Sequence, residues 1–160
     1  MDIKKTANLL INFAIRRLAE IFGIIIFVAG TLLLLALVYY SPEDPNFIFP
    51  DNAEIKNILG FHGSFVSDLF FQSIGLISYF VSLTLLITGI NIFRRKELFL
   101  IIENSFLVVL YSLVGSLFFA FFYKDAFSLY INGNGGFVGG YLNKFFFINF
   151  IQNYENIFYF

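Results

Sequence analysis

Residues 21–40, IFGIIIFVAGTLLLLALVYY, decide the fold class of this chain. These 20 residues contain no charge, and a helix with a rise of ~1.5 Å per residue crosses a ~30 Å hydrocarbon core in about that length. Tyr39 and Tyr40 end the run, where aromatic side chains favour the membrane–water interface. The run is longer than the apolar core of a cleavable signal peptide, and no small-x-small cleavage site follows it. We therefore predict a transmembrane helix that also anchors the chain.

The composition of the whole chain agrees with this interpretation. Of its 160 residues, 59% are hydrophobic and 13% are charged. A soluble domain has about 45–50% apolar and about 25% charged residues, so much of this surface must face lipid. The net charge of −1 gives no overall basic character to suggest nucleic-acid binding. Cysteine is absent, which excludes disulfides and thiolate metal sites.

Two more uncharged or weakly charged stretches predict further membrane spans, at residues 69–93 and 98–123, joined by the short basic turn 94–97. The expected fold is therefore all-α, a single polytopic membrane domain with three clear spans. Each of the two later spans carries small residues on one helical face, which favour close helix packing in lipid. They are Gly75, Ser78, Ser82 and Gly89 in the second span, and Ser105, Ser112 and Ser116 in the third.

The segments between the spans predict loops and one surface helix. Residues 41–68 hold all three prolines and are expected to form a loop with one short amphipathic helix near residues 52–59. Residues 124–160 begin with a glycine-rich stretch, which we expect to form turns. They continue, at 145–160, with an amphipathic helix that ends where a fourth span would begin. The polar face of this helix is formed by Asn149, Gln152, Asn153 and Asn156.

Basic residues next to the spans predict the orientation of the chain in the membrane. Three spans place residues 1–20 and the turn 94–97 on one side, which has seven Lys and Arg residues against three on the other. The basic N-terminus and the turn 94–97 are therefore expected in the cytoplasm, and the segments 41–68 and 124–160 outside. The seven residues are Lys4, Lys5, Arg16, Arg17, Arg94, Arg95 and Lys96.

No pattern in the sequence predicts catalysis, a metal site or a cofactor site. His62 is the only histidine, and a lone histidine without neighbouring ligands is a weak metal candidate. The glycines of residues 132–140 match neither the P-loop, which needs Gly-Lys-[Ser/Thr], nor the dinucleotide pattern, because Val138 stands in place of the third glycine. Gly136 and Gly140 instead form a small-xxx-small pair for packing. Glu103 is expected at the interface rather than in an ion path.

Four strings of residues, in order, resemble the four-helix membrane domain that begins FtsK/SpoIIIE DNA translocases. YSPEDPNF at 40–47 is similar to that family's S-x-x-D-P-[ST]-[WF], and NILGFHGSFVSD at 57–68 to its N-x-x-G-x-x-G-A-x-x-A-D. IGLISY at 74–79 resembles F-G-x-x-A-Y, and GGFVG at 135–139 resembles G-G-x-x-G. The matching positions are Ser41, Pro42, Asp44, Pro45, Asn57, Gly60, Gly63, Asp68, Gly75, Tyr79, Gly135, Gly136 and Gly139.

The resemblance implies a membrane anchor that localises an FtsK-type translocase to the division septum of the bacterial inner membrane. It implies self-association and contacts with other division proteins, and no nucleic-acid contact through this domain. The ATPase motor, with its ATP and magnesium, has no matching residues here, so we expect a chain cut before or within the fourth span. Asp44 and Asp68 are expected to be solvated charges or helix caps, with structural or partner contacts as the alternative.

Two other functions compete with the anchor. A small stand-alone structural subunit of a membrane complex would need only helices that pack on partners. A transporter or channel half would need polar side chains along a path through the membrane, and the spans offer mainly Ser, Thr and Gln72.

Overall fold

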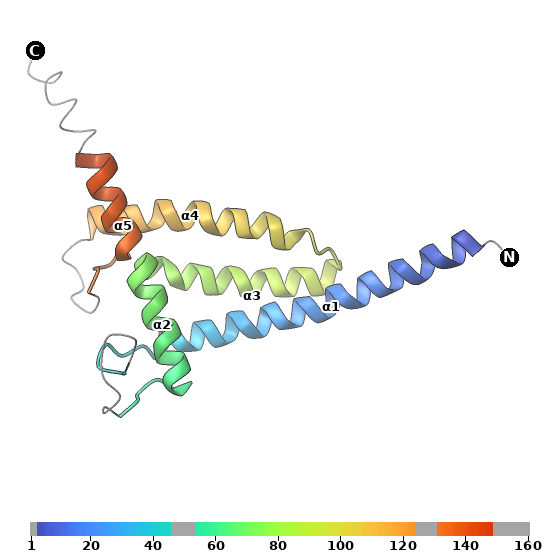
Figure 1. The fold of residues 1–160 in the computed structure, drawn as a ribbon, viewed down its shortest axis with the longest axis horizontal. Coiled ribbons are helices and arrows are strands. Elements are labelled where there is room, and N and C mark those ends of the chain that lie inside the picture. Colours follow the sequence, from blue (N-terminus) through green and yellow to red (C-terminus); the bar gives the residue numbers. More distant parts are fainter. Residues whose placement is uncertain (1–2, 46–53, 124–130, 149–160) are drawn as a thin grey trace, which may run out of the picture.

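The computed structural model describes residues 3–45, 54–123 and 131–148. All regular structure in these ranges is helical, which confirms the predicted all-α class. Three helical segments are long and apolar enough to cross a membrane: Ala7–Val38, Gly60–Arg95 and Leu100–Phe122. The three long helices lie side by side, and the two shorter ones cross the bundle at one end (Figure 1).

The first helix is much longer than a span requires. Helix α1 covers Ile3–Val38, 36 residues, or about 54 Å at the rise of an α-helix. The expected span 21–40 therefore forms only its second part, and the basic N-terminal segment is helical as well. In Figure 1 this N-terminal part extends well past the other helices.

The second predicted span is not one helix. Helix α2 runs over Gly60–Ile74, the 3-10 turn η1 over Gly75–Ile77 and helix α3 over Ser78–Arg95. Helix α2 lies across the end of the bundle, whereas α3 runs antiparallel to α1 (Figure 1). The break comes at Gly75, whose φ of +69° is a conformation that side chains other than glycine rarely adopt. Helix α3 alone has 18 residues, about 27 Å, which is close to the thickness of the hydrocarbon core.

Two of the predicted loops are partly helical. The expected loop 41–68 is wrong in its last third, because α2 begins at Gly60. The described residues 54–59 form an irregular segment with a turn at 57–59 rather than the expected short helix. Helix α4, Leu100–Phe122, matches the third predicted span. The glycine-rich stretch was expected to form turns, yet it contains helix α5, Gly136–Leu142, followed by the π-helical η2, Asn143–Ile148. The rest of the predicted amphipathic helix 145–160 lies outside the described residues.

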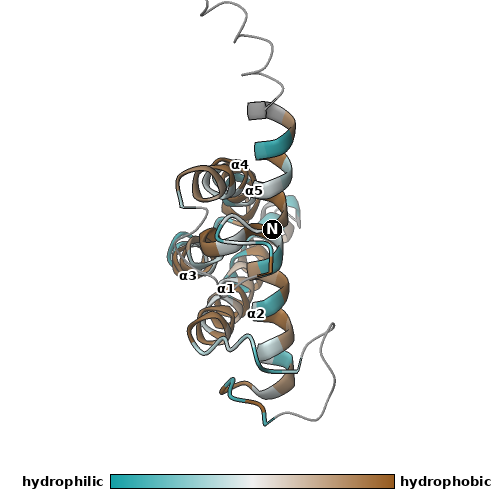
Figure 2. Ribbon diagram, turned by 90° about the vertical axis from the view of Figure 1, so that its left-hand side faces the viewer, coloured by the Kyte–Doolittle hydropathy of each residue, from teal (hydrophilic) through white to brown (hydrophobic). Residues whose placement is uncertain are grey.

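The packing is reversed relative to a soluble protein. Within the described residues, buried side chains include more polar than hydrophobic ones, and large apolar side chains cover the outside of α1, α3 and α4. Figure 2 shows these three helices mainly in the hydrophobic colour, with the polar colour gathered on α2, α5 and the loop beside them. A small apolar cluster of Leu33, Leu37, Phe71 and Val81 fills the space between α1, α2 and α3. Lipid is the medium that suits such a surface, and the chain is a membrane protein.

Glycines let α1 and α3 approach each other along their length. A Cβ atom on Gly23 would lie 2.7 Å from the backbone nitrogen of Phe93, and one on Gly89 would lie 2.5 Å from that of Phe27.

The contact of α3 with α4 is polar instead. The Thr84 and Tyr111 hydroxyls are 2.8 Å apart, and the Asn104 amide donates to Thr88 over 2.8 Å. Close backbones and interhelical hydrogen bonds are the two usual means of joining helices in lipid.

Candidate functional site at the polar end of the bundle

One end of the molecule gathers most of its buried polar side chains, and we call it the polar end. It consists of residues 39–45, residues 54–59, helix α2, the turn η1 and residues 131–142. Helix α1 ends there, α2 crosses there and α5 packs beside them (Figure 1). Every position of the four family-like strings that the structure describes lies in this part of the molecule or within one turn of it.

Asp44 and Asn57 fold the loop onto the end of α1. Asp44 is fully buried, and its two carboxylate oxygens accept the backbone N–H groups of Lys56 and Asn57, each over 2.9 Å. The Asn57 amide donates to the carbonyls of Ala36 (2.9 Å) and Tyr39 (3.1 Å), which belong to the last turn of α1 and the residue after it. These carbonyls have no partner within the helix. Asp44 is therefore a structural residue, and the expectation of a solvated charge is wrong.

Gly63 and Ser64 attach α2 to the same loop. A Cβ on Gly63 would lie 2.2 Å from Oδ1 of Asn57, so only glycine lets the helix pass this close. The Ser64 hydroxyl donates to the carbonyl of Pro45 over 3.0 Å. Two contacts, Gly63 with Asn57 and Ser64 with Pro45, thus join the loop to the first two turns of α2.

A second group of polar side chains connects α1, α2 and residue 132. Tyr40 donates its hydroxyl to Oδ1 of Asp68 over 3.1 Å, and Asp68 is only 6% exposed. One turn further along α2, Oε1 of Gln72 accepts the side-chain amide of Asn132 over 3.0 Å. Tyr79 on α3 adds a hydrogen bond from its hydroxyl to the carbonyl of Leu37, at 3.2 Å. Asp68, like Asp44, is buried and hydrogen-bonded rather than solvated.

Three glycines pack closely where α2 turns into α3, and we call this contact the glycine junction. It consists of Gly75, Ser116, Asn134, Gly136 and Gly139. A Cβ on Gly75 would lie 1.9 Å from the Asn134 carbonyl oxygen, which accepts the N–H of Leu76 over 2.9 Å. A Cβ on Gly139 would lie 2.2 Å from the carbonyl oxygen of Ser116. The Ser116 hydroxyl donates to the carbonyl of Ile74 over 2.9 Å.

The junction corrects two interpretations of the glycine-rich stretch. Gly135 and Gly139, rather than Gly136 and Gly140, lie one turn apart against α4, because added Cβ atoms on both would meet the backbone of Ser116. An added Cβ on Gly140 meets nothing within 4 Å. Gly136 instead takes a positive φ of 64° and lies against Gly75. The small residues of α4 separate in the same way, since Ser112 and Ser116 are buried and Ser105 is exposed.

One exposed ion pair lies at the rim of the polar end. The Lys56 ammonium is hydrogen-bonded to the Glu43 carboxylate. This contact lowers the pKa of Glu43 below its ordinary value of 4.5 and raises the pKa of Lys56 above its ordinary value of 10.5. Both side chains are open to water, so the pair is weak.

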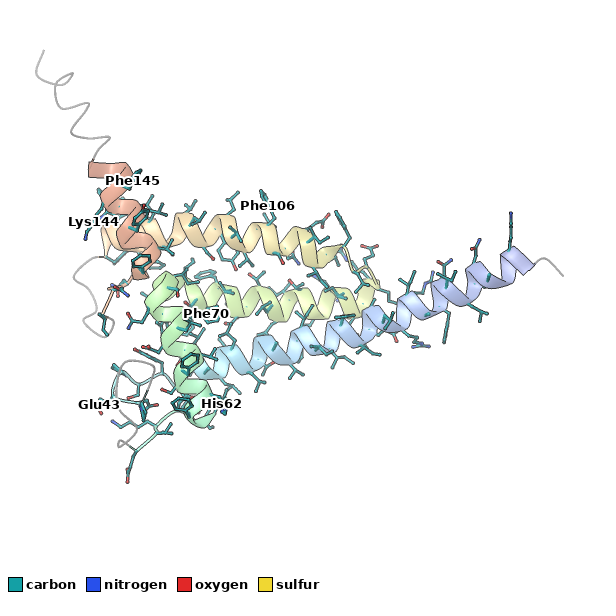
Figure 3. All side chains as sticks on the ribbon, viewed as in Figure 1. Glu43, His62, Phe70, Phe106, Lys144 and Phe145 are labelled. Carbon is teal, nitrogen blue, oxygen red and sulfur yellow. The ribbon has the colours of Figure 1, made fainter. Side chains whose placement is uncertain are left out.

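The described acidic side chains and the histidine of the polar end lie apart from one another. Among the described residues, no group of three His, Cys, Asp or Glu side chains lies close enough there to hold a metal ion. The buried carboxylates already accept hydrogen bonds from backbone or tyrosine donors, as structural carboxylates do. His62 is exposed near the start of α2, at the same end as Glu43 (Figure 3). These hydrogen bonds hold the loop and α2 in place against the end of α1.

The opposite end of the bundle, which consists of the N-terminal half of α1 and the turn between α3 and α4, carries most of the described basic residues, and we call it the basic end. The Glu20 carboxylate accepts Nζ of Lys96 over 2.8 Å and Nη1 of Arg17 over 2.6 Å, which joins α1 to the α3–α4 turn. Lys4, Arg16, Arg94 and Arg95 are exposed, Lys5 lies within α1, and Glu103 is exposed in the first turn of α4. The predicted orientation of these groups relative to the cytoplasm stays a prediction.

Several residues of these contacts were missed in the sequence. Glu20 stands directly before the uncharged run and three residues after Arg17, a spacing that signals an ion pair on a helix. Asn132 and Asn134 flank a glycine, which signals a turn, but nothing in the sequence shows that Asn132 binds Gln72 of α2 or that Asn134 binds Leu76 of η1. Of the family-like positions, Ser41 is half-buried, Pro42 is exposed, Pro45 is buried, and Gly60 has a positive φ of 65° with open space around it.

Comparison of the sequence with known proteins identifies the family of this chain. A sequence model described as the 4TM region of DNA translocase FtsK/SpoIIIE matches residues 15–151. The chain is 36% identical over 69 residues to the DNA translocase FtsK of Caulobacter vibrioides, covering 43% of this chain and 8% of that protein. It is 29% identical over 96 residues to the FtsK of Rickettsia prowazekii, covering 59% of this chain and 12% of that protein.

The chain spans about a tenth of the length of these relatives. No solved structure matches it. The family model nevertheless covers most of the chain, including α2, α3, α4, α5 and both ends of the bundle. The chain therefore belongs to the family defined by the 4TM region of the DNA translocases FtsK and SpoIIIE.

Proposed function

We propose that this chain is the membrane anchor and septum-localising domain of an FtsK-type DNA translocase that acts in cell division and chromosome segregation. The observation that carries the proposal is the family match over residues 15–151, together with the position of the family-like residues in one hydrogen-bonded end. Such an end suits a domain that presents a fixed surface outside the bilayer. We expect self-association and contacts with other division proteins, and no nucleic-acid contact.

The chain itself is proposed to be non-enzymatic. Within the described residues the buried side chains of Asp44, Asn57 and Asp68 make structural hydrogen bonds. No group of three His, Cys, Asp or Glu side chains in these residues lies close enough to hold a metal ion. We expect ATP and magnesium to bind in a motor outside these residues, and the role of this domain to be position and assembly.

We also propose that the basic end lies in the cytoplasm of a bacterial inner membrane and the polar end outside it. Support comes from the grouping of Arg94, Arg95 and Lys96 with the basic half of α1 at one end of the bundle. The chain has no cysteine, so single cysteines can report the topology. Glu54→Cys should react with a membrane-impermeant maleimide in intact cells, and Arg95→Cys only after the membrane is opened. The reverse pattern would contradict this orientation.

The localisation is tested with a fluorescent protein fused to the chromosomal copy. We expect a band at mid-cell that appears as the septum forms. A uniform signal around the cell in dividing cells would contradict the septal role. The Asp44→Ala variant is a second test. It should lose the mid-cell band while the protein remains in the membrane fraction, because the substitution loosens the polar end without altering a span.

An antibody to residues 1–20 distinguishes the anchor from a stand-alone subunit. An immunoblot of membranes should show a band far above 18.4 kDa, the mass of these 160 residues. A band near that mass would favour a structural subunit that acts without a motor on the same chain.

A further inference from the structure

A groove runs along one side of the contact between α1 and α3. It has a volume of about 250 Å³, and all six residues that line it are apolar: Gly23, Ile24, Phe27, Gly89, Ile90 and Phe93. The two glycines form its floor, where an added Cβ on Gly89 would lie 2.5 Å from the backbone of Phe27. Side chains on both helices form its walls. The groove thus follows from the close approach of the helices and is open to an apolar chain.

The groove leads to the basic end. At about 100° per residue, Arg94 lies only about 40° around α3 from Ile90, on the flank of the groove, whereas Arg95 lies about 140° from Ile90, on the far side of the helix. On α1, Arg17 lies on the groove side as well, with its guanidinium 5.2 Å above the Phe13 ring and bonded to Glu20. Among the described residues, Arg94 has no acidic partner within ion-pair distance.

The depth of these groups in the membrane follows from the helix lengths. Helix α3 begins at the polar end and has 18 residues, about 27 Å, which nearly equals a hydrocarbon core of ~30 Å. Its last residues, Arg94 and Arg95, therefore reach the level of the lipid headgroups. The Glu20–Lys96 ion pair holds α1 at that same level. The groove consequently runs inward from the headgroup region.

We propose that this groove binds one anionic phospholipid, with an acyl chain over Gly23 and Gly89 and the headgroup phosphate at Arg94 and Arg17. Arginine binds phosphate through paired N–H donors, and basic pockets between transmembrane helices select anionic headgroups. A second copy of this chain is a poorer occupant, because a symmetric contact would bring the two unpaired Arg94 side chains together. The proposal needs only the membrane insertion of the helices and is independent of the division role.

The absence of tryptophan allows a direct test on the whole 160-residue chain in vesicles. Phe93→Trp places a fluorophore in the groove wall. Phe106→Trp places one on α4, where the side chain is 68% exposed and points away from the other helices (Figure 3). Each variant is reconstituted in phosphatidylcholine vesicles with a fixed minor fraction of brominated lipid. The brominated lipid is either phosphatidylglycerol or phosphatidylcholine, and the quenching of tryptophan by each is compared.

Bound phosphatidylglycerol should quench the Phe93→Trp variant with an apparent preference over phosphatidylcholine of at least about fivefold, the size expected for one basic side chain at an anionic surface. The Phe106→Trp variant should show a preference near one. Adding Arg94→Gln to Phe93→Trp should bring its preference near one as well, and adding Arg95→Gln, the matched control one residue away, should leave it unchanged. Both arginines are exposed, and circular dichroism checks that the helices persist.

Three results would overturn the proposal. Equal preferences in the Phe93→Trp and Phe106→Trp variants would mean that anionic lipid only accumulates around the basic end. Equal effects of Arg94→Gln and Arg95→Gln would mean that total charge, rather than a site, attracts the lipid. Protection of the Phe93→Trp fluorophore from both brominated lipids, increasing with the protein-to-lipid ratio, would mean that a second copy fills the groove.

Discussion

Different interactions hold the helices together at the polar end and along the membrane-spanning parts of α1, α3 and α4, which we call the shafts. In the shafts, contact depends on glycine, as at Gly23 and Gly89, and on a few hydroxyl and amide pairs. At the polar end, a network of buried hydrogen bonds through Asp44, Asn57 and Asp68 fixes the loop and α2 against the end of α1. Lipid is as apolar as leucine, so burying apolar side chains gains little between helices in a bilayer. Geometry here must come from polar groups and from close backbones.

The largest effect is expected at the glycine junction. Gly75→Ala should lower the free energy of unfolding by about 3 kcal/mol or more, because the residue has a φ of +69° and its Cβ would lie 1.9 Å from the Asn134 carbonyl oxygen. Thermal unfolding in detergent, followed by circular dichroism, measures this. Gly133→Ala is the matched control, since its φ is +72° with nothing within 4 Å, and it should cost only about 1 kcal/mol. Equal costs would show that the contact with Asn134 is unimportant.

The shafts are tested at Gly89. Gly89→Ala should cost about 2 kcal/mol, the typical penalty for overpacking a close contact, because its Cβ would lie 2.5 Å from the backbone nitrogen of Phe27. The same unfolding measurement applies. Gly140→Ala in α5 meets no atom within 4 Å and should be neutral or slightly stabilising, since alanine favours the helix. A neutral Gly89→Ala would mean that α1 and α3 are not held by backbone contact.

The loop of the polar end depends on the two oxygens of Asp44. Asp44→Ala should cost about 2 kcal/mol, because it leaves the N–H groups of Lys56 and Asn57 buried without acceptors. Asp44→Asn keeps one acceptor oxygen and should fall between Asp44→Ala and the unchanged protein. Limited proteolysis should also cut residues 54–59 faster in Asp44→Ala than in the unchanged protein. If Asp44→Asn and Asp44→Ala are equally stable, the two hydrogen bonds do not act separately.

The smallest effect is expected at the exposed pair of Glu43 and Lys56. The lowered pKa of Glu43 means that its contribution is present above pH 4.5 and is lost as the pH falls through the lowered value. The raised pKa of Lys56 means that its contribution is present below pH 10.5 and is lost as the pH rises through the raised value. Between these limits, Glu43→Gln should leave the unfolding midpoint almost unchanged at physiological salt. A large drop at neutral pH would show that the pair is better shielded from water than its exposure indicates.

The shafts were largely predictable from sequence and the polar end largely was not. Most of the predicted spans 21–40 and 98–123 lies in the long helices α1, which ends at Val38, and α4, Leu100–Phe122, because a long apolar run has no other stable form in lipid. We predicted one helical span over residues 69–93, and the hydropathy of that stretch does not reveal the break at Gly75 within it. That glycine was assigned to a packing face, whereas its positive φ and its contact with Asn134 end a helix there.

Asp44 and Asp68 show the same limit for the candidate site. Both carboxylates stand in a polar stretch, where a solvated charge is the ordinary expectation. Their burial depends on acceptors and donors far away in the chain: Asp44 meets Lys56 and Asn57, and Asp68 meets Tyr40. The family resemblance identified the positions that matter, but no residue pattern showed what each one binds.

By itself the sequence determined that the chain enters a membrane, that it is helical, which stretches are apolar enough to cross, and which family it resembles. The cost of placing charge or unpaired backbone in lipid is decided residue by residue, so it can be read locally. The tertiary structure alone decided that α2 lies across the bundle, that the acidic residues are buried, and that a groove opens between α1 and α3. These features arise from contacts such as Ser116 with Ile74, 42 positions apart, and local sequence does not encode such partners.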